Sequence, residues 1–341
     1  MSTTPSASLA SRVYLDHAAT TPVRREVAEQ VTADLRGHLG GWANPAAQHA
    51  SGRRAGAVLA EARARLAAAL DVDPHEVLFT SGGTQADALA VAGRVLAARA
   101  TGTDRPRVVT SSIEHPAVLD SARTAVAHLG AEHVEVGADD AGLVDQADLR
   151  EAVAEPSTAL VSVMTANNET GVVQDMAGLV EAVREASGAR RPADPGYVPV
   201  HSDAVAALGK VPVRPRDWGL DAMTVTGHKI GAPVGIGALI ARRDLTLVAP
   251  TGGGRADRGV RQTGGAARTG AGGGRGAAGR PRDASGGRGA RGLHGAPVVR
   301  GLRHRGAAHG PGHGRRRRVG GLRLPRRGDA AQPRAAGHGP R

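Results

Sequence analysis

Lys229 is the residue of this chain that is best placed to act as a nucleophile. It lies in a glycine-rich segment, residues 226–235, which separates apolar runs at residues 222–225 and 236–241. We expect the two runs to form buried strands and the segment between them to form a tight turn. An amine held in such a turn is partly desolvated, which lowers its pKa and makes it a better nucleophile. The alternative, an exposed turn lysine, would be preferred if this segment stood alone.

Two other segments could supply a phosphate site and a buried carboxylate. The strand predicted at residues 77–80 leads into Gly83 and Thr84. These residues open a helix and offer backbone N–H groups, a hydroxyl and the positive end of the helix dipole to an anion. Asp203 ends the strand predicted at residues 198–203, where a carboxylate can pair with a protonated pyridine nitrogen. Taken singly, the first is a common Gly-Thr turn and the second a helix N-cap.

His115 and Asn168 also follow predicted strands, at residues 107–110 and 160–164. His115 can stack on a cofactor ring or transfer protons, although a lone histidine here would be read as a polar loop residue. The carboxyl ends of parallel strands meet at one edge of a sheet, so we expect these groups to lie close to Lys229. Together they predict a site for pyridoxal phosphate.

Strands and helices alternate along the part of the chain that contains these groups. Beside the strands already named, helices are predicted at residues 23–35, 53–70, 84–100, 116–129 and 177–186. This alternation predicts an α/β domain built on a mostly parallel sheet.

Composition excludes several classes of function. No run approaches the roughly 20 apolar residues that a membrane helix needs, and the first 11 residues lack the apolar core of a signal peptide. We therefore expect a cytoplasmic protein. The sequence has 0 Cys, which excludes disulfides, thiolate metal sites and a cysteine nucleophile from this chain. No metal site is predicted.

The net charge of +12 is distributed unevenly. Residues 251–341 contain 21 Arg, 3 Asp and neither Lys nor Glu, an excess of 18 positive charges, so residues 1–250 carry a net charge of −6. Nucleic-acid binding is therefore not predicted for the body of the chain.

Residues 251–341 form a low-complexity tail of Arg, Gly, Ala, Pro and His. We expect it to be disordered, as we do residues 1–12, because it cannot bury enough apolar surface. One interpretation is a nucleic-acid-binding arm, residues 262–341. The other, which we favour, is the product of a frame shift, because the tail consists of residues with GC-rich codons.

The motifs of residues 13–245 resemble, in their order, those of the cysteine desulfurase branch of the class V aminotransferase family. The matching segments are residues 14–22, 44–45, 79–84, 114–119, 167–171, 201–204 and 227–229. The resemblance implies a pyridoxal 5′-phosphate enzyme of fold type I that works as a homodimer, with residues 13–250 as the cofactor-binding large domain.

The resemblance also implies roles for the site residues. Lys229 would bond covalently to the cofactor, Asp203 would pair with the pyridine nitrogen, and His115 would stack on the ring and move protons. Gly83 and Thr84 would bind the phosphate. Thr226 and His228 would also contact the phosphate. Asn168 would contact the cofactor and the substrate, and Asn44 would contact the substrate.

The implied activity converts L-cysteine to L-alanine and passes the sulfur, through an enzyme cysteine, to an acceptor protein for iron–sulfur clusters or thio-cofactors. Because the chain has 0 Cys, we expect this transfer to be impaired. The alternatives are another class V activity (an aminotransferase or a cysteine or selenocysteine lyase) and nucleic-acid binding through the tail.

The chain departs from the family pattern at three places. Ala206 stands where the family has a glutamine that reaches the cofactor, a change expected to cost on the order of 1 kcal/mol. Residues 85–88 lack the usual Glu and Asn. After about Pro250 the C-terminal small domain, with its catalytic-cysteine loop, is no longer recognisable.

Overall fold

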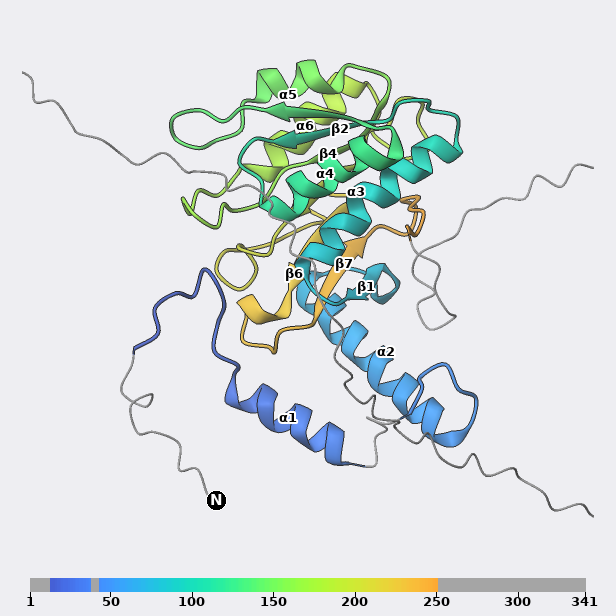
Figure 1. The fold of residues 1–341 in the computed structure, drawn as a ribbon, viewed down its shortest axis with the longest axis vertical. Helices are drawn as coiled ribbons and strands as arrows, with labels where there is room; N and C mark the ends of the chain where they lie inside the picture. Colours follow the sequence, from blue (N-terminus) through green and yellow to red (C-terminus); the bar gives the residue numbers. More distant parts are fainter. Residues whose placement is uncertain (1–12, 38–42, 251–341) are drawn as a thin grey trace, which may run out of the picture. The chain divides into compact units, whose positions relative to one another are not determined.

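The computed structural model describes residues 13–37 and 43–250 of the chain. The predictions of disorder for residues 1–12, and of a disordered or nucleic-acid-binding tail over residues 251–341, concern residues outside this description. The described part contains a seven-stranded sheet in the order β1-β7-β6-β5-β4-β2-β3, flanked by helices (Figure 1). The prediction of an α/β fold is confirmed.

The sheet is mostly parallel, as predicted. Strands β3, β2, β4, β5 and β6 run parallel to one another, whereas β7 pairs antiparallel with both β6 and β1. The strands are β1 (Val77–Thr80), β2 (Arg107–Ser111), β3 (Glu132–Val136), β4 (Thr158–Ser162), β5 (Val200–Asp203), β6 (Ala222–Thr226) and β7 (Gly237–Ala241).

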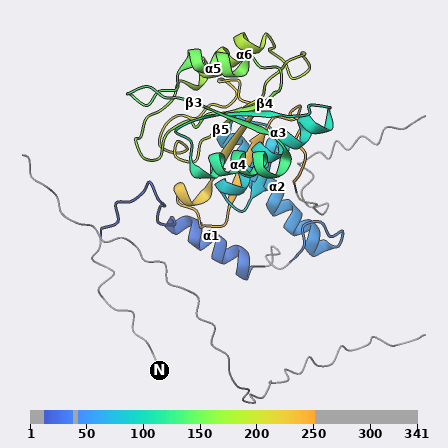
Figure 2. The same ribbon diagram turned by 45° about the horizontal axis from the view of Figure 1, so that its top comes forward.

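Helices cover both faces of this sheet (Figures 1 and 2). The helices of the described residues are α1 (Arg25–Arg36), α2 (Ala50–Leu70), α3 (Gly83–Ala100), α4 (Pro116–Leu129), α5 (Gln146–Val153) and α6 (Met176–Ser187), with short 3₁₀ turns η1 (Pro74–Glu76) and η2 (Gly227–Lys229). Helix α1 has no buried residue and lies away from the sheet. Helices α3 and α4 pack on one face, and α5, α6 and the end of α2 pack on the other. Because both faces are covered, β4, β5, β6 and β7 are buried along their whole length.

The central elements match the sequence predictions most closely. The strand at Val77–Thr80 and the helix at Pro116–Leu129 have the predicted bounds, whereas β4 begins two residues earlier than predicted and β5 two residues later. Strand β3 and helix α5 were not predicted. β3 is an edge strand with polar residues at alternate positions and only one buried residue, so its pattern carries little apolar signal.

Close backbone packing joins β7 to the start of α3. A Cβ atom at Gly237 would lie 2.6 Å from the carbonyl carbon of Gly82, so any larger residue would force the two segments apart. This contact fixes the N-terminus of α3 beside the carboxyl end of β6, because Gly237 pairs with Thr226. The residues at these ends therefore lie at one edge of the sheet.

Among the helices of the described residues, none combines the length and the apolar character required to cross a bilayer.

Candidate functional site

A pocket of about 210 Å³ lies at the carboxyl ends of β5 and β6, beside the first turn of α3. It gathers most of the site residues that the sequence predicts. Its lining includes Gly83, Thr84, His115, Asn168, Asp203, Thr226, His228 and Lys229. Asn44 is not in this lining: it is exposed, and its side chain accepts a hydrogen bond from the backbone N–H of Ala46 at 2.8 Å.

Lys229 ends η2, and the N-terminal segment of the described chain holds this turn in place. The hydroxyl and the backbone N–H of Thr21 both donate to the carbonyl oxygen of His228, at 2.8 Å each. The Lys229 ammonium in turn donates to the carbonyl oxygen of Ala18. Partial burial lowers the pKa of Lys229, and the positive charge of Lys210 lowers it further. A lowered pKa favours the neutral, nucleophilic amine.

Asp203 is the buried acid of the pocket, with 3% of its surface exposed. One carboxylate oxygen accepts a hydrogen bond from the backbone N–H of Val205 at 2.8 Å. Burial raises the pKa of Asp203, while this hydrogen bond and the positive charges of His115 and Lys229 act against the rise. A cationic group bound in the pocket would therefore stabilise the ionised form of Asp203. Ala206, which replaces the family's glutamine, also lines the pocket.

The N-terminus of α3 closes the opposite side of the pocket. Its N-cap is Gly82, which has no side chain to occupy the first N–H groups of the helix. Those N–H groups and the Thr84 hydroxyl can bind an anion that lies at the positive end of the helix dipole. Gly83 packs closely against Val205, because a Cβ there would lie 3.0 Å from a Val205 methyl carbon.

His115 is the N-cap of α4. Its Nδ1 accepts a hydrogen bond from the backbone N–H of Ala117 at 3.1 Å, so a neutral ring carries its proton on Nε2. The Asn167 amide donates to the carbonyl oxygen of Ile113 at 2.9 Å and thereby joins the His115 loop to the loop that carries Asn168.

Sequence reasoning missed Glu114, which precedes His115 in the same motif. Its Oε1 accepts hydrogen bonds from the backbone N–H of Met164, at 2.6 Å, and from the Ser111 hydroxyl. The other carboxyl oxygen, Oε2, is buried and has no hydrogen-bond partner in the described part of the chain. Burial raises the pKa of Glu114 to about 8. Glu114 thus holds the loop that carries His115 against the end of β4.

Two replacements of Glu114 are expected to differ. Glu114→Ala leaves the Met164 N–H and the Ser111 hydroxyl unpaired, which costs about 1–3 kcal/mol of unfolding free energy for each buried group. Glu114→Gln keeps an oxygen acceptor for both groups and should cost less near pH 5. Denaturant titrations of the full chain at several pH values measure the difference.

The pH dependence has a definite sign. The folded-state pKa of Glu114, about 8, lies above the ordinary glutamate value of 4.5, so the wild-type chain loses stability as the pH rises between these values. Glu114→Gln cannot titrate and should gain stability relative to wild type over this range, by at most about 1.4 kcal/mol per pH unit. If the stabilities of the two proteins change equally with pH, Glu114 is ionised in the folded chain and the prediction is wrong.

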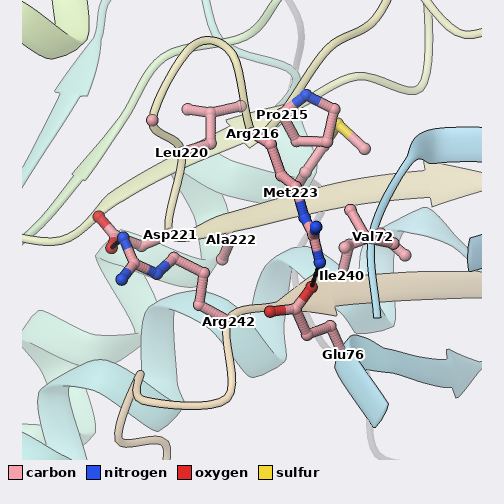
Figure 3. A pocket seen from close by; sticks show the side chains of 11 residues that line it. Val72, Glu76, Pro215, Arg216, Leu220, Asp221, Ala222, Met223, Ile240 and Arg242 are labelled. Atoms are coloured by element: carbon pink, nitrogen blue, oxygen red, sulfur yellow. Dashed lines mark ion pairs between the residues drawn. The ribbon is translucent and has the colours of Figure 1, made fainter. Parts of the chain in front are cut away.

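A second pocket, of about 240 Å³, lies at the other ends of β6 and β7 (Figure 3). Apolar side chains, among them Leu220 and Met223, line it together with charged residues. The charges are paired. A guanidinium nitrogen of Arg216 lies 3.6 Å from a carboxylate oxygen of Glu76, and one of Arg242 lies 3.6 Å from a carboxylate oxygen of Asp221. None of the predicted site residues lines this pocket, so the candidate site is the pocket that contains Lys229.

The residues of the Lys229 pocket fit pyridoxal 5′-phosphate. The α3 N-terminus and the hydroxyls of Thr84 and Thr226 can hold a phosphate, the Asp203 carboxylate suits a ring nitrogen, and Lys229 supplies an amine. The Thr226 hydroxyl donates to the carbonyl oxygen of Ile236 at 3.2 Å, so it can donate to a phosphate only if that bond is broken. Among the described residues the Thr84 hydroxyl has no such acceptor, so it is the better phosphate donor.

Comparison with known proteins adds independent information. The family model described as aminotransferase class V matches residues 13–266. The chain is 42% identical over 249 residues to the IscS-like cysteine desulfurase of Mycobacterium tuberculosis (strain ATCC 25618 / H37Rv), a match that covers 73% of this chain and 60% of the relative. The chain thus spans about 60% of the length of that relative.

Solved structures show the same fold. A NifS-like protein superposes with a TM-score of 0.65 at 30% identity, covering 73% of this chain and 64% of the other. A structure described as SspA in complex with cysteine superposes with a TM-score of 0.63 at 30% identity, covering 72% of this chain and 66% of the other.

Proposed function

Because the chain belongs to the class V aminotransferase family, whose members depend on pyridoxal 5′-phosphate, we propose that residues 13–250 bind this cofactor and act with it on L-cysteine. The observation that carries the proposal is one pocket lined by a lysine amine, a buried carboxylate and a helix N-terminus. Each of these groups meets a different part of the cofactor.

The chain's own residues would divide the work among them. Thr84 and the α3 N-terminus would hold the phosphate, with Gly83, His228 and Thr226 beside it. Asp203 balances a positive charge on the ring nitrogen. His115, fixed at the start of α4 by its bond to Ala117, would stack on the ring.

When bound, pyridoxal phosphate supplies an aldehyde that reacts with amines and a ring that withdraws electrons from the α-carbon of an amino acid. Lys229 would provide the amine and would hold or move a proton at Nζ. His115 Nε2 carries a proton that it can donate. Asn168 binds the cofactor or the substrate from the loop after β4, and Asn44 would reach the substrate only if its loop moves from its exposed position.

The substrate proposal is supported by the names of the related proteins, which are cysteine desulfurases, and by the solved structure of SspA in complex with cysteine. The chain itself has 0 Cys, and a desulfurase passes sulfur through an enzyme thiol. We therefore propose that sulfur transfer is impaired in this chain. This absence favours, as a second candidate, a class V activity that needs no enzyme thiol, an aminotransferase or a cysteine or selenocysteine lyase.

A homodimer is supported by a groove of about 430 Å³ between α3 and α4, which opens beside Thr84 and His115. Alanine side chains line much of it, so a second copy of the chain could pack closely against it and complete the site. Light scattering of the full chain tests this stoichiometry. A sulfur-acceptor protein and a cytoplasmic location belong to the same proposal.

Titration of the full chain with pyridoxal phosphate tests the central proposal. We expect saturation at one cofactor per chain, with an absorbance band in the visible that L-cysteine changes and that D-cysteine does not. Failure of a folded chain to bind the cofactor would contradict the proposal. Product analysis with L-cysteine, L-selenocysteine and other amino acids separates the two candidate activities.

A further inference from the structure

A row of buried polar side chains crosses the sheet beneath α3 and ends at the Lys229 pocket. Ser162 on β4 contacts His201 on β5, with 2.9 Å between Oγ and Nδ1. His201 then contacts Thr224 on β6, with 3.0 Å between Nε2 and Oγ1. Thr224 in turn neighbours Asp87 of α3, which lines the pocket, and acts on its carboxyl group. All four side chains are at most 1% exposed.

Asp87 lacks the partners that a buried carboxylate requires. Its Oδ1 has no hydrogen-bond partner within the described ranges. The only basic side chain within ion-pair distance there is His201, whose Nε2 lies 3.7 Å from that oxygen. The acids Asp203 and Glu114 also act on Asp87. A buried charge without a counter-ion is far less stable than the neutral acid.

We propose that Asp87 is a positioning residue for Asp203: it stays neutral and donates its proton to Thr224, so that the negative charge of these two carboxyls resides on Asp203. The effect of this charge on cofactor binding rests on the proposed function, because Asp203 is the group proposed to pair with the cofactor's ring nitrogen. The charge assignment itself concerns the chain without cofactor.

The surroundings of the two acids differ in the direction that the assignment requires. Burial raises the pKa of Asp87 well above its usual range, and the neighbouring Asp203 raises it further. Burial also raises the pKa of Asp203, but the positive charges of His115 and Lys229 act against that rise. Burial lowers the pKa of His201 to about 3, so His201 is neutral and cannot compensate an ionised Asp87.

The protonation of Asp87 sets the direction of every hydrogen bond in the row. A neutral Asp87 donates to the Thr224 oxygen, and the Thr224 hydroxyl donates to Nε2 of His201. His201 then carries its proton on Nδ1 and donates to Ser162. An ionised Asp87 accepts from Thr224, which reverses the row and moves the His201 proton to Nε2. The tautomer of His201 therefore reports the charge of Asp87.

Nitrogen-15 NMR of histidine-labelled, cofactor-free full chain at pH 7 reads this tautomer. We expect the Nδ1–H form of His201 in the wild-type chain and in Asp87→Asn, because the asparagine amide donates to Thr224 as the neutral acid does. If Asp87→Asn folds poorly, the tautomer of His201 in the wild-type chain still tests the proposal. An Nε2–H tautomer in the wild-type chain overturns the proposal.

Unfolding equilibria at several pH values give a second readout. A folded-state pKa above the unfolded value of 3.8 makes the wild-type chain lose stability as the pH rises. The ratio of the unfolding constants of wild type and Asp87→Asn should therefore rise by up to about tenfold per pH unit above that value. Asp140→Asn, an exposed control, should show no such rise. A flat or falling ratio for Asp87→Asn overturns the proposal.

Cofactor affinity separates this inference from the proposed function. Asp87→Asn preserves the neutral donor, so it should bind pyridoxal phosphate within about threefold of wild type. Chains with the expected tautomer that bind no pyridoxal phosphate support the charge assignment and contradict the proposed function. A large loss of affinity in Asp87→Asn alone, with the wild-type chain binding normally, shows that Asp87 acts as an anion and overturns the inference.

Discussion

Replacing Lys229 by alanine is expected to abolish the covalent attachment of pyridoxal phosphate to the chain. The sequence contains only two lysines, Lys210 and Lys229, and only Lys229 lines the pocket. After borohydride reduction of the cofactor-loaded wild-type chain, we expect the added mass on the peptide that contains Lys229. In Lys229→Ala the visible absorbance and the added mass should both be lost.

The other lysine provides the matched control. Lys210 is exposed, and its positive charge lowers the pKa of Lys229. Lys210→Ala should therefore keep the covalent attachment. Because a repelling charge is removed, the apparent pKa of Lys229 should rise, and attachment at a fixed pH near neutrality should weaken modestly. Cofactor mass on Lys210 in the wild-type chain, or undiminished absorbance in Lys229→Ala, would contradict the assigned role of Lys229.

The elements that carry the pocket could be predicted because local sequence determines them. Asp203 and Thr226 end strands that are buried along their whole length, and the apolar run of β6 is recognisable without any tertiary information. The rule that ligands gather at the carboxyl ends of parallel strands then placed His115, Asn168 and Lys229 at one edge. The structure brings these residues into one pocket.

The roles of Asp87 and Glu114 could not be predicted, because they depend on tertiary packing. Asp87 lies in the second turn of α3, where an acid is ordinarily solvent-exposed, and its burial arises from the contact of α3 with β5 and β6. Glu114 likewise becomes buried because the end of β4 packs against its loop. Strand β3 could not be predicted for a related reason. Its extended structure depends on pairing with β2, and its own residue pattern does not indicate a strand.

The chain loaded with pyridoxal phosphate is expected to acquire no sulfur from L-cysteine. Conversion of L-cysteine to L-alanine breaks the bond between Cβ and sulfur and reduces Cβ. In a desulfurase the electrons come from a thiol whose sulfur is oxidised as it bonds to the departing sulfur, giving a persulfide. With 0 Cys in the chain, no residue can take this part, and the transfer requires a separate thiol.

Two measurements follow from this balance of atoms and electrons. Intact-mass analysis of the full chain after incubation with L-cysteine should show no addition of sulfur. Alanine should form only as fast as a free thiol, either dithiothreitol or a second molecule of L-cysteine, accepts the sulfur. Its rate should therefore rise with added dithiothreitol, and little alanine should form when L-cysteine is supplied at less than one equivalent per chain without another thiol. Full conversion to alanine under that last condition would show that the chain has a sulfur-accepting or electron-donating group other than cysteine. Release of pyruvate in place of alanine would instead identify the lyase activity, because elimination leaves Cβ unreduced and needs no thiol.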